Sequence, residues 1–181
     1  MGENAVNRAI ACTALLLFLS GCSTLGGTAR ITVATATLRS ADGKPTGTAA
    51  LTALGETVTL RLVASGLPAG VHGLHLHSIG KCDGPAFASA GGHLNPHGRQ
   101  HGTNNPAGTH LGDLPNLTIS GAGTGTLSFA LPGQRSAVES ALFDADGSAI
   151  VIHAAADDNI TDPSGNSGPR IACGVFERKA G

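Results

Sequence analysis

The sequence predicts one all-β domain, a β-sandwich or flattened barrel of antiparallel strands that carries two long functional loops. Three observations lead to this fold class. Short apolar segments alternate with polar residues at a period of two, as half-buried strands do. The 27 glycines and 9 prolines separate these segments at frequent intervals. No stretch has a sustained apolar stripe at helical spacing, and the composition of the 181 residues does not change along the chain.

Four strands show the alternation clearly, the first of them after a spacer rich in glycine and threonine. Because side chains of a strand point alternately to its two faces, residues two apart share a face, and an apolar set on one face predicts contact with the core. The apolar positions are, in chain order, Ile31 and Val33; Val58, Leu60, Leu62 and Ala64; Leu127, Phe129 and Leu131; and Ile171, Cys173 and Val175.

Two long segments interrupt the strands, at about residues 78–115 and 154–169. Both exceed the usual length of a connection in a compact domain. Loops of that length are commonly functional, so we expect the chemistry of the protein to lie there.

Composition excludes two classes of binding protein. The net charge is −1 and the lysines and arginines are scattered, so no basic stripe is available for nucleic acid. The chain has no tryptophan, no tyrosine and five phenylalanines, which leaves no aromatic platform for stacking bases or sugars.

The N-terminus reads as an export signal. Arg8 precedes an apolar run at 9–19 that is too short to span a bilayer, and small residues follow. The motif Leu19-Ser20-Gly21-Cys22 resembles a bacterial lipobox, in which the cysteine receives lipid. We therefore expect a signal peptide at 1–21, a flexible tether at 22–29 and the domain at 30–181, lipid-anchored to a membrane of the periplasm or cell envelope. An ordinary signal peptide cut near Gly27 and a retained N-terminal membrane anchor are alternatives, and both still export the domain.

Export decides how the four cysteines are interpreted. Cys12 leaves with the signal and Cys22 carries lipid, so Cys82 and Cys173 remain. An even pair in an oxidising compartment predicts a disulfide. Two separate buried thiols are the alternative.

Three histidines lie on strand-like segments. His75 and His77 are two residues apart, so both rings point to one face while Leu74 and Leu76 point into the core. His153 ends the alternating segment 150–153 and can present its ring in the same way. These rings are candidates to share one metal ion.

The first long loop offers a second ligand set. His93, His101, His110 and Asp113 follow one another at intervals of eight, nine and three residues. Three imidazoles and one carboxylate form a tetrahedral zinc set. His97, four residues after His93, does not indicate a metalloprotease helix, because proline and glycine flank it and the glutamate of that motif is absent. We expect His97 to be exposed, and His72 to be a structural hydrogen-bonding residue.

Six blocks of the chain form a set with a fixed order and fixed intervals. The blocks are Gly73-Leu74-His75-Leu76-His77; Ala90-Gly91-Gly92-His93-Leu94-Asn95-Pro96; His101-Gly102; His110-Leu111-Gly112-Asp113-Leu114; Val151-Ile152-His153; and Gly168-Pro169-Arg170-Ile171-Ala172-Cys173-Gly174-Val175. Taken together, they look like the copper/zinc superoxide dismutase family, in the same order and at matching intervals over roughly residues 30 to 178. The fold of that family is a Greek-key β-sandwich or flattened barrel, which agrees with the strand pattern.

The resemblance implies that both metals share one ligand. Copper is implied at His75, His77, His93 and His153, and zinc at His93, His101, His110 and Asp113. Asp157 matches an aspartate that accepts hydrogen bonds from one histidine of each site, here His75 and His101. A plain loop carboxylate is the alternative for Asp157.

The resemblance also implies the reaction. Superoxide would be converted to oxygen and hydrogen peroxide by one-electron cycling, which copper can perform and zinc cannot. Arg170 would guide the anionic substrate, and His93 would supply a proton. A surface arginine without a role is the alternative for Arg170. A lysine-free second loop, at 158–168, leaves steering to Arg170 and the bound metal.

Two other functions compete with the enzyme. An exported copper-binding or copper-buffering protein would need no anion guide, and a zinc-stabilised surface domain would leave His75, His77 and His153 without a purpose. The sequence leaves both a monomer and a homodimer open.

Overall fold

Residues 1–2 and 29–179 are described by the structure, a computed structural model. Ten strands, one α-helix and one short 3-10 helix follow one another in this part of the chain. They are β1 (Ile31–Ser40), β2 (Pro45–Leu54), β3 (Thr57–Ala64), β4 (Gly70–His72), β5 (Leu74–His77), η1 (Ala88–Ala90), β6 (Leu117–Ile119), β7 (Gly125–Ala130), α1 (Arg135–Leu142), β8 (Ala149–His153), β9 (Arg170–Val175) and β10 (Glu177–Arg178).

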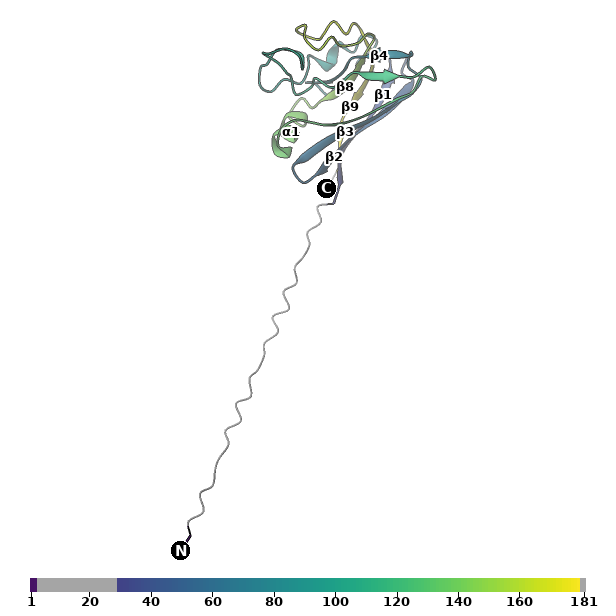
Figure 1. The fold of residues 1–181 in the computed structure, drawn as a ribbon. Coiled ribbons are helices and arrows are strands. Elements are labelled where there is room, and N and C mark those ends of the chain that lie inside the picture. Colours follow the sequence, from purple (N-terminus) through teal and green to yellow (C-terminus); the bar gives the residue numbers. More distant parts are fainter. Residues whose placement is uncertain (3–28, 180–181) are drawn as a thin grey trace.

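The strands form a curled antiparallel sheet (Figure 1). Its order is β5-β8-β9-β1-β2-β3-β7, with β10 also paired to β1, and β4 and β6 form a second small sheet. Neighbours that are distant in sequence, such as β5 with β8 and β3 with β7, require the crossing connections of a Greek key. The predicted all-β fold class is confirmed.

Aliphatic side chains fill the space inside the curled sheet. On β3 the alternation is as predicted, because Val58, Leu60 and Leu62 are at most 1% exposed while Arg61 points to solvent. Ile31 differs from expectation, since its side chain is 44% exposed. The pairing of β1 with β2 shifts register between Thr32 and Ala34, so the alternation does not continue through this point.

One helix interrupts the all-β pattern. Helix α1 buries Val138 and Leu142, which are four residues apart and therefore lie on one face. Two apolar positions in eight residues do not make a sustained stripe, which is why the sequence pattern did not predict this helix. Arg135 and Glu139 form an ion pair with the same spacing.

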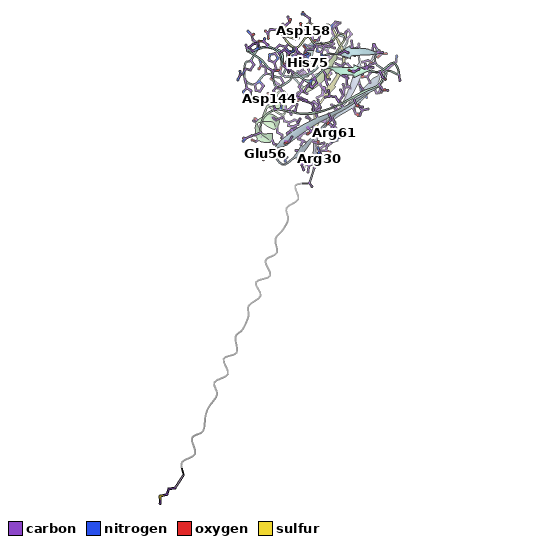
Figure 2. All side chains as sticks on the ribbon, viewed as in Figure 1. Arg30, Glu56, Arg61, His75, Asp144 and Asp158 are labelled. Atoms are coloured by element: carbon purple, nitrogen blue, oxygen red, sulfur yellow. A yellow bond between two sulfur atoms is a disulfide. The ribbon has the colours of Figure 1, made fainter. Side chains whose placement is uncertain are left out.

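Both long loops occur where they were predicted. One connects β5 to β6 over residues 78–116 and the other connects β8 to β9 over residues 154–169. Figure 1 shows them together at one end of the domain, opposite the turn between β2 and β3. In Figure 2, Asp158 marks the outer edge of this end and His75 lies beneath it.

The predicted signal peptide, the lipidated Cys22 and most of the tether fall on residues 3–28, outside the described residues. Within the described ranges, no helix is both long enough and apolar enough to cross a membrane.

Candidate metal centre

Strands β5 and β8 place three histidines on one face of the sheet. Their register sets His75 opposite Val151 and His77 opposite Ala149. Leu74 and Leu76, on the other face of β5, are fully buried in the core. A register shift at the end of β8 brings His153 opposite Arg170 of β9.

The loop 78–116 attaches to the free edge of β5 through its backbone. Leu76 N–H donates to the Gly112 carbonyl at 2.9 Å, and Leu94 N–H donates to the Leu76 carbonyl at 2.8 Å. A Cβ at position 112 would collide with the Leu76 carbonyl, so only glycine permits this approach. The attachment pairs His93 with His77 and Asp113 with His75. Residues distant in sequence thus come together beside one strand.

One cluster consists of four imidazoles with unpartnered nitrogens. The ligand atoms of His75, His77, His93 and His153 lie within 4.8 Å of one another. His75 Nδ1 and the Nε2 atoms of the other three are buried, and no hydrogen-bond partner for them exists among the described residues. Buried polar atoms without partners are costly. Four that converge on one point are explained by a cation that all of them can bind.

The opposite ring nitrogens in this cluster are occupied. His77 Nδ1 lies 3.0 Å from the Gly91 carbonyl and His153 Nδ1 lies 2.9 Å from the Gly168 carbonyl. Because a carbonyl only accepts, each Nδ1 must carry the proton, which leaves Nε2 with a lone pair. These contacts therefore fix the tautomer that a metal site needs.

The second cluster gathers around Asp113. Its Oδ1 lies 2.9 Å from His93 Nδ1, 2.9 Å from His101 Nδ1 and 3.1 Å from His110 Nδ1. Four donors at about 2.0–2.1 Å from one zinc ion would lie about 3.3 Å apart, so these separations fit a tetrahedral zinc set. The other oxygen of Asp113 accepts from Gly102 N–H, Thr109 hydroxyl and His110 N–H. His93 belongs to both clusters, one ring nitrogen facing each.

Asp157 links the two clusters from behind. Its Oδ2 accepts from His75 Nε2 at 2.6 Å and its Oδ1 accepts from His101 Nε2 at 3.0 Å. This is the contact pair that the resemblance implied. Asn116, which sequence reasoning missed, holds Asp157 in place by hydrogen bonds to its backbone N–H and carbonyl. Gly165 leaves room for the carboxylate, because a Cβ there would overlap it.

Burial keeps these imidazole rings neutral, so that one nitrogen of each ring carries no proton. It lowers the pKa of His75 to about 3, of His77 to about 2 and of His153 to about 4. For Asp157, burial alone would raise the pKa, but hydrogen bonds from His75 and His101 outweigh it and lower the pKa to about 2. Neutral imidazoles and an ionised carboxylate are the forms that bind and orient around a cation.

Arg170 lies beside the first cluster at the start of β9. Its Nη1 donates to the Phe87 carbonyl and its Nη2 to the Gly91 carbonyl, each at 2.6 Å. A pocket in the surface is lined by this arginine together with His77, His93 and His153. Burial lowers the pKa of Arg170. The guanidinium is therefore held rigidly at the entrance to the histidines.

The predicted disulfide is present between Cys82 and Cys173, whose Cα atoms are 5.7 Å apart. It fastens the loop that carries Phe87 and Gly91 to the strand that carries Arg170.

Two further histidines lie outside both clusters. His97 is exposed, as predicted. His72 is buried, with its ring nitrogens 2.8 Å from the His153 carbonyl and 3.0 Å from the Pro68 carbonyl. Its role is to pack and to hydrogen-bond, which agrees with the structural role expected for it.

Comparison with known proteins decides the family. The family model described as copper/zinc superoxide dismutase matches residues 45–176, which is most of the chain and includes both clusters. The chain belongs to the copper/zinc superoxide dismutase family. Among curated members, the superoxide dismutase [Cu-Zn] of Deinococcus radiodurans is 40% identical over 176 residues, covering 91% of this chain and 92% of that protein. The superoxide dismutase [Cu-Zn] of Caulobacter vibrioides is 41% identical over 148 residues, covering 80% of this chain and 85% of that protein.

Solved structures give the same fold. A superoxide dismutase-like protein from Bacillus subtilis superimposes with a TM-score of 0.74 at 38% identity, covering 80% of this chain and 99% of that one. Copper/zinc superoxide dismutases use the two metals in their name, and in this member the two clusters around His93 are the groups that could hold them.

Proposed function

We propose that this protein is an active copper/zinc superoxide dismutase, which converts two superoxide anions and two protons to oxygen and hydrogen peroxide. Copper would be held by His75, His77, His93 and His153, and zinc by His93, His101, His110 and Asp113. The observation that carries the proposal is the convergence of four unpartnered, buried ring nitrogens beside a second complete ligand set that shares His93. The bound metals supply one-electron exchange at copper and a fixed positive charge at zinc.

The chain itself admits and positions the substrate. The Arg170 guanidinium is fixed by two carbonyls at the pocket entrance, so it can attract a small anion and donate hydrogen bonds to it without reorganising. His93 lines the same pocket, and its Nε2 has no hydrogen-bond partner among the described residues. Whenever that atom is not bound to copper, it can hold a proton and pass it to the peroxide product.

The protein loaded with both metals is expected to consume superoxide, and Arg170→Ala is expected to lower the second-order rate about tenfold or more. The rate of the variant is also expected to depend less on ionic strength, because part of the attraction for the anion is lost. Pulse radiolysis over a range of salt concentrations measures both quantities.

Arg61→Gln provides a matched control, since Arg61 is an exposed arginine on β3 and lies away from His75 in Figure 2. A loaded wild-type protein that binds copper tightly but leaves superoxide intact would favour a copper-buffering protein. An unchanged salt dependence in Arg170→Ala would contradict the guiding role of Arg170.

We also propose that the protein is exported and anchored to a membrane of the cell envelope through lipid on Cys22. The lipobox at 19–22 supports this location, and so does the disulfide between Cys82 and Cys173, which persists in an oxidising compartment. Labelling with a fatty-acid analogue is expected to mark the wild-type protein and not Cys22→Ala. Equal labelling of both would argue against the anchor.

A further inference from the structure

We infer that Arg99 is a second guide for the anionic substrate, which the chain presents from the loop that carries the zinc ligands. The inference rests on the proposed dismutase function and adds a residue to it. Arg99 lines the same pocket as Arg170 and His153. The second loop, residues 154–169, has no lysine, so the sequence had left steering to Arg170 and the metal. The structure supplies another cation from a different loop.

The backbone of Arg99 is fixed relative to the metal centre. The Asn95 side chain forms hydrogen bonds with both backbone groups of Arg99. Its Oδ1 accepts from Arg99 N–H at 2.9 Å, and its Nδ2 donates to the Arg99 carbonyl at 2.8 Å. The same carbonyl lies 3.1 Å from His110 Nε2 and accepts a hydrogen bond from it. His110 Nδ1 faces Asp113 in the second cluster. The position of the Arg99 backbone is therefore set by a residue of that cluster.

The side chain of Arg99 is free to act on an anion. It is exposed, and in the hydrogen bonds and ion pairs of residues 29–179 Arg99 takes part only through its backbone N–H and carbonyl. Arg170 differs, because two carbonyls hold its guanidinium at the entrance. An exposed, unpaired cation at the rim acts on approaching anions over about one Debye length, whereas a fixed cation inside binds them.

Asp162, whose negative charge repels an anionic substrate, lines the same pocket. Asp162 accepts from His101 N–H through its Oδ1 at 2.6 Å, so its charge is held at the rim near Arg99 and Arg170. Apart from bound metal, the side chains of the whole chain sum to a net charge of −1 and offer an anion no general attraction. The local balance of Arg99 and Asp162 therefore adds to the effect of Arg170 on how fast a small anion arrives.

The test compares charge-neutralising variants of the metal-loaded protein. Arg99→Gln is expected to lower the second-order rate with superoxide about twofold at low salt, the effect of one exposed unit charge in water, and to converge with wild type at high salt. Asp162→Asn keeps an oxygen acceptor for His101 N–H and is expected to raise the rate. Arg99→Lys should match wild type, and Arg61→Gln is the distant control. The affinity of each variant for the anion azide, measured by optical titration, should change in the same order as the rates. This measurement needs no turnover.

Three results would overturn the inference. Arg99→Gln could match wild type at low salt, it could slow the reaction equally at every ionic strength, or Arg99→Lys could behave like the glutamine variant. The second and third results would mean that the side chain is structural. Each of these results leaves the proposed function intact. If the metal-loaded wild-type protein is inactive, the proposed function is contradicted, and the azide titration then decides the role of Arg99.

Discussion

Replacing His153 with alanine is expected to abolish superoxide dismutation and to leave one zinc ion bound per chain. The substitution removes one of the four converging nitrogens, and His153 takes no part in the cluster around Asp113. Loss of a hydrogen-bond partner that only orients a metal ligand commonly lowers metal affinity or activity 10- to 100-fold. Loss of a ligand itself should therefore lower activity by more than about a hundredfold. Elemental analysis together with a superoxide assay measures both outcomes.

His97→Ala is the matched control, because His97 is an exposed histidine outside both clusters. It should bind both metals and react at the wild-type rate. Full activity in His153→Ala would contradict the copper assignment. Loss of zinc together with copper would show that the two clusters are not separable in the way that the geometry indicates.

Removing the disulfide, by replacing both Cys82 and Cys173 with serine, is expected to lower the free energy of unfolding and the reaction rate together. The bond closes a loop with a sequence separation of 91 residues. The chain-entropy model gives about 4.6 kcal/mol for such a loop. The two carbonyls that hold Arg170 belong to residues of the same loop, so loosening it should also release the guanidinium.

Denaturant unfolding of the metal-free protein measures the first effect, and the salt dependence of the rate measures the second. Ser89→Ala is a suitable control in the same loop, since it removes only the hydrogen bond from Asp83 N–H and should cost about 1 kcal/mol. If the double serine variant unfolds like wild type, the crosslink does not stabilise the fold. If it keeps the wild-type rate and salt dependence, Arg170 is held without it.

The parts of the centre that lie on strands could be predicted because a strand has a fixed period. Residues two apart on β5 must share a face, so His75 and His77 had to point together once Leu74 and Leu76 were assigned to the core. The candidate ligands of the loop were proposed as one set from residue type and interval, and they lie together in the cluster around Asp113; the family resemblance added that His93 also joins the first cluster.

The residues that were missed act through contacts that have no local pattern. Asn116 reaches Asp157 across 41 positions, and the exposed Ile31 precedes a register shift that depends on β2. Helix α1 has too few turns to be recognised by periodicity. Arg99 was one of several scattered arginines until the structure placed it among the residues that line the pocket.

The sequence by itself determined the kinds of ligand, the faces of the strands and the two segments that leave the sheet. Only the tertiary structure decided which nitrogen of each ring is left without a proton, which oxygen of Asp157 meets each histidine, and that Arg99 lines the same pocket as Arg170. The reason is physical. Strand periodicity is set by the geometry of each residue, whereas the pairing of the 78–116 loop with β5 arises from hydrogen bonds between backbone groups far apart in the chain.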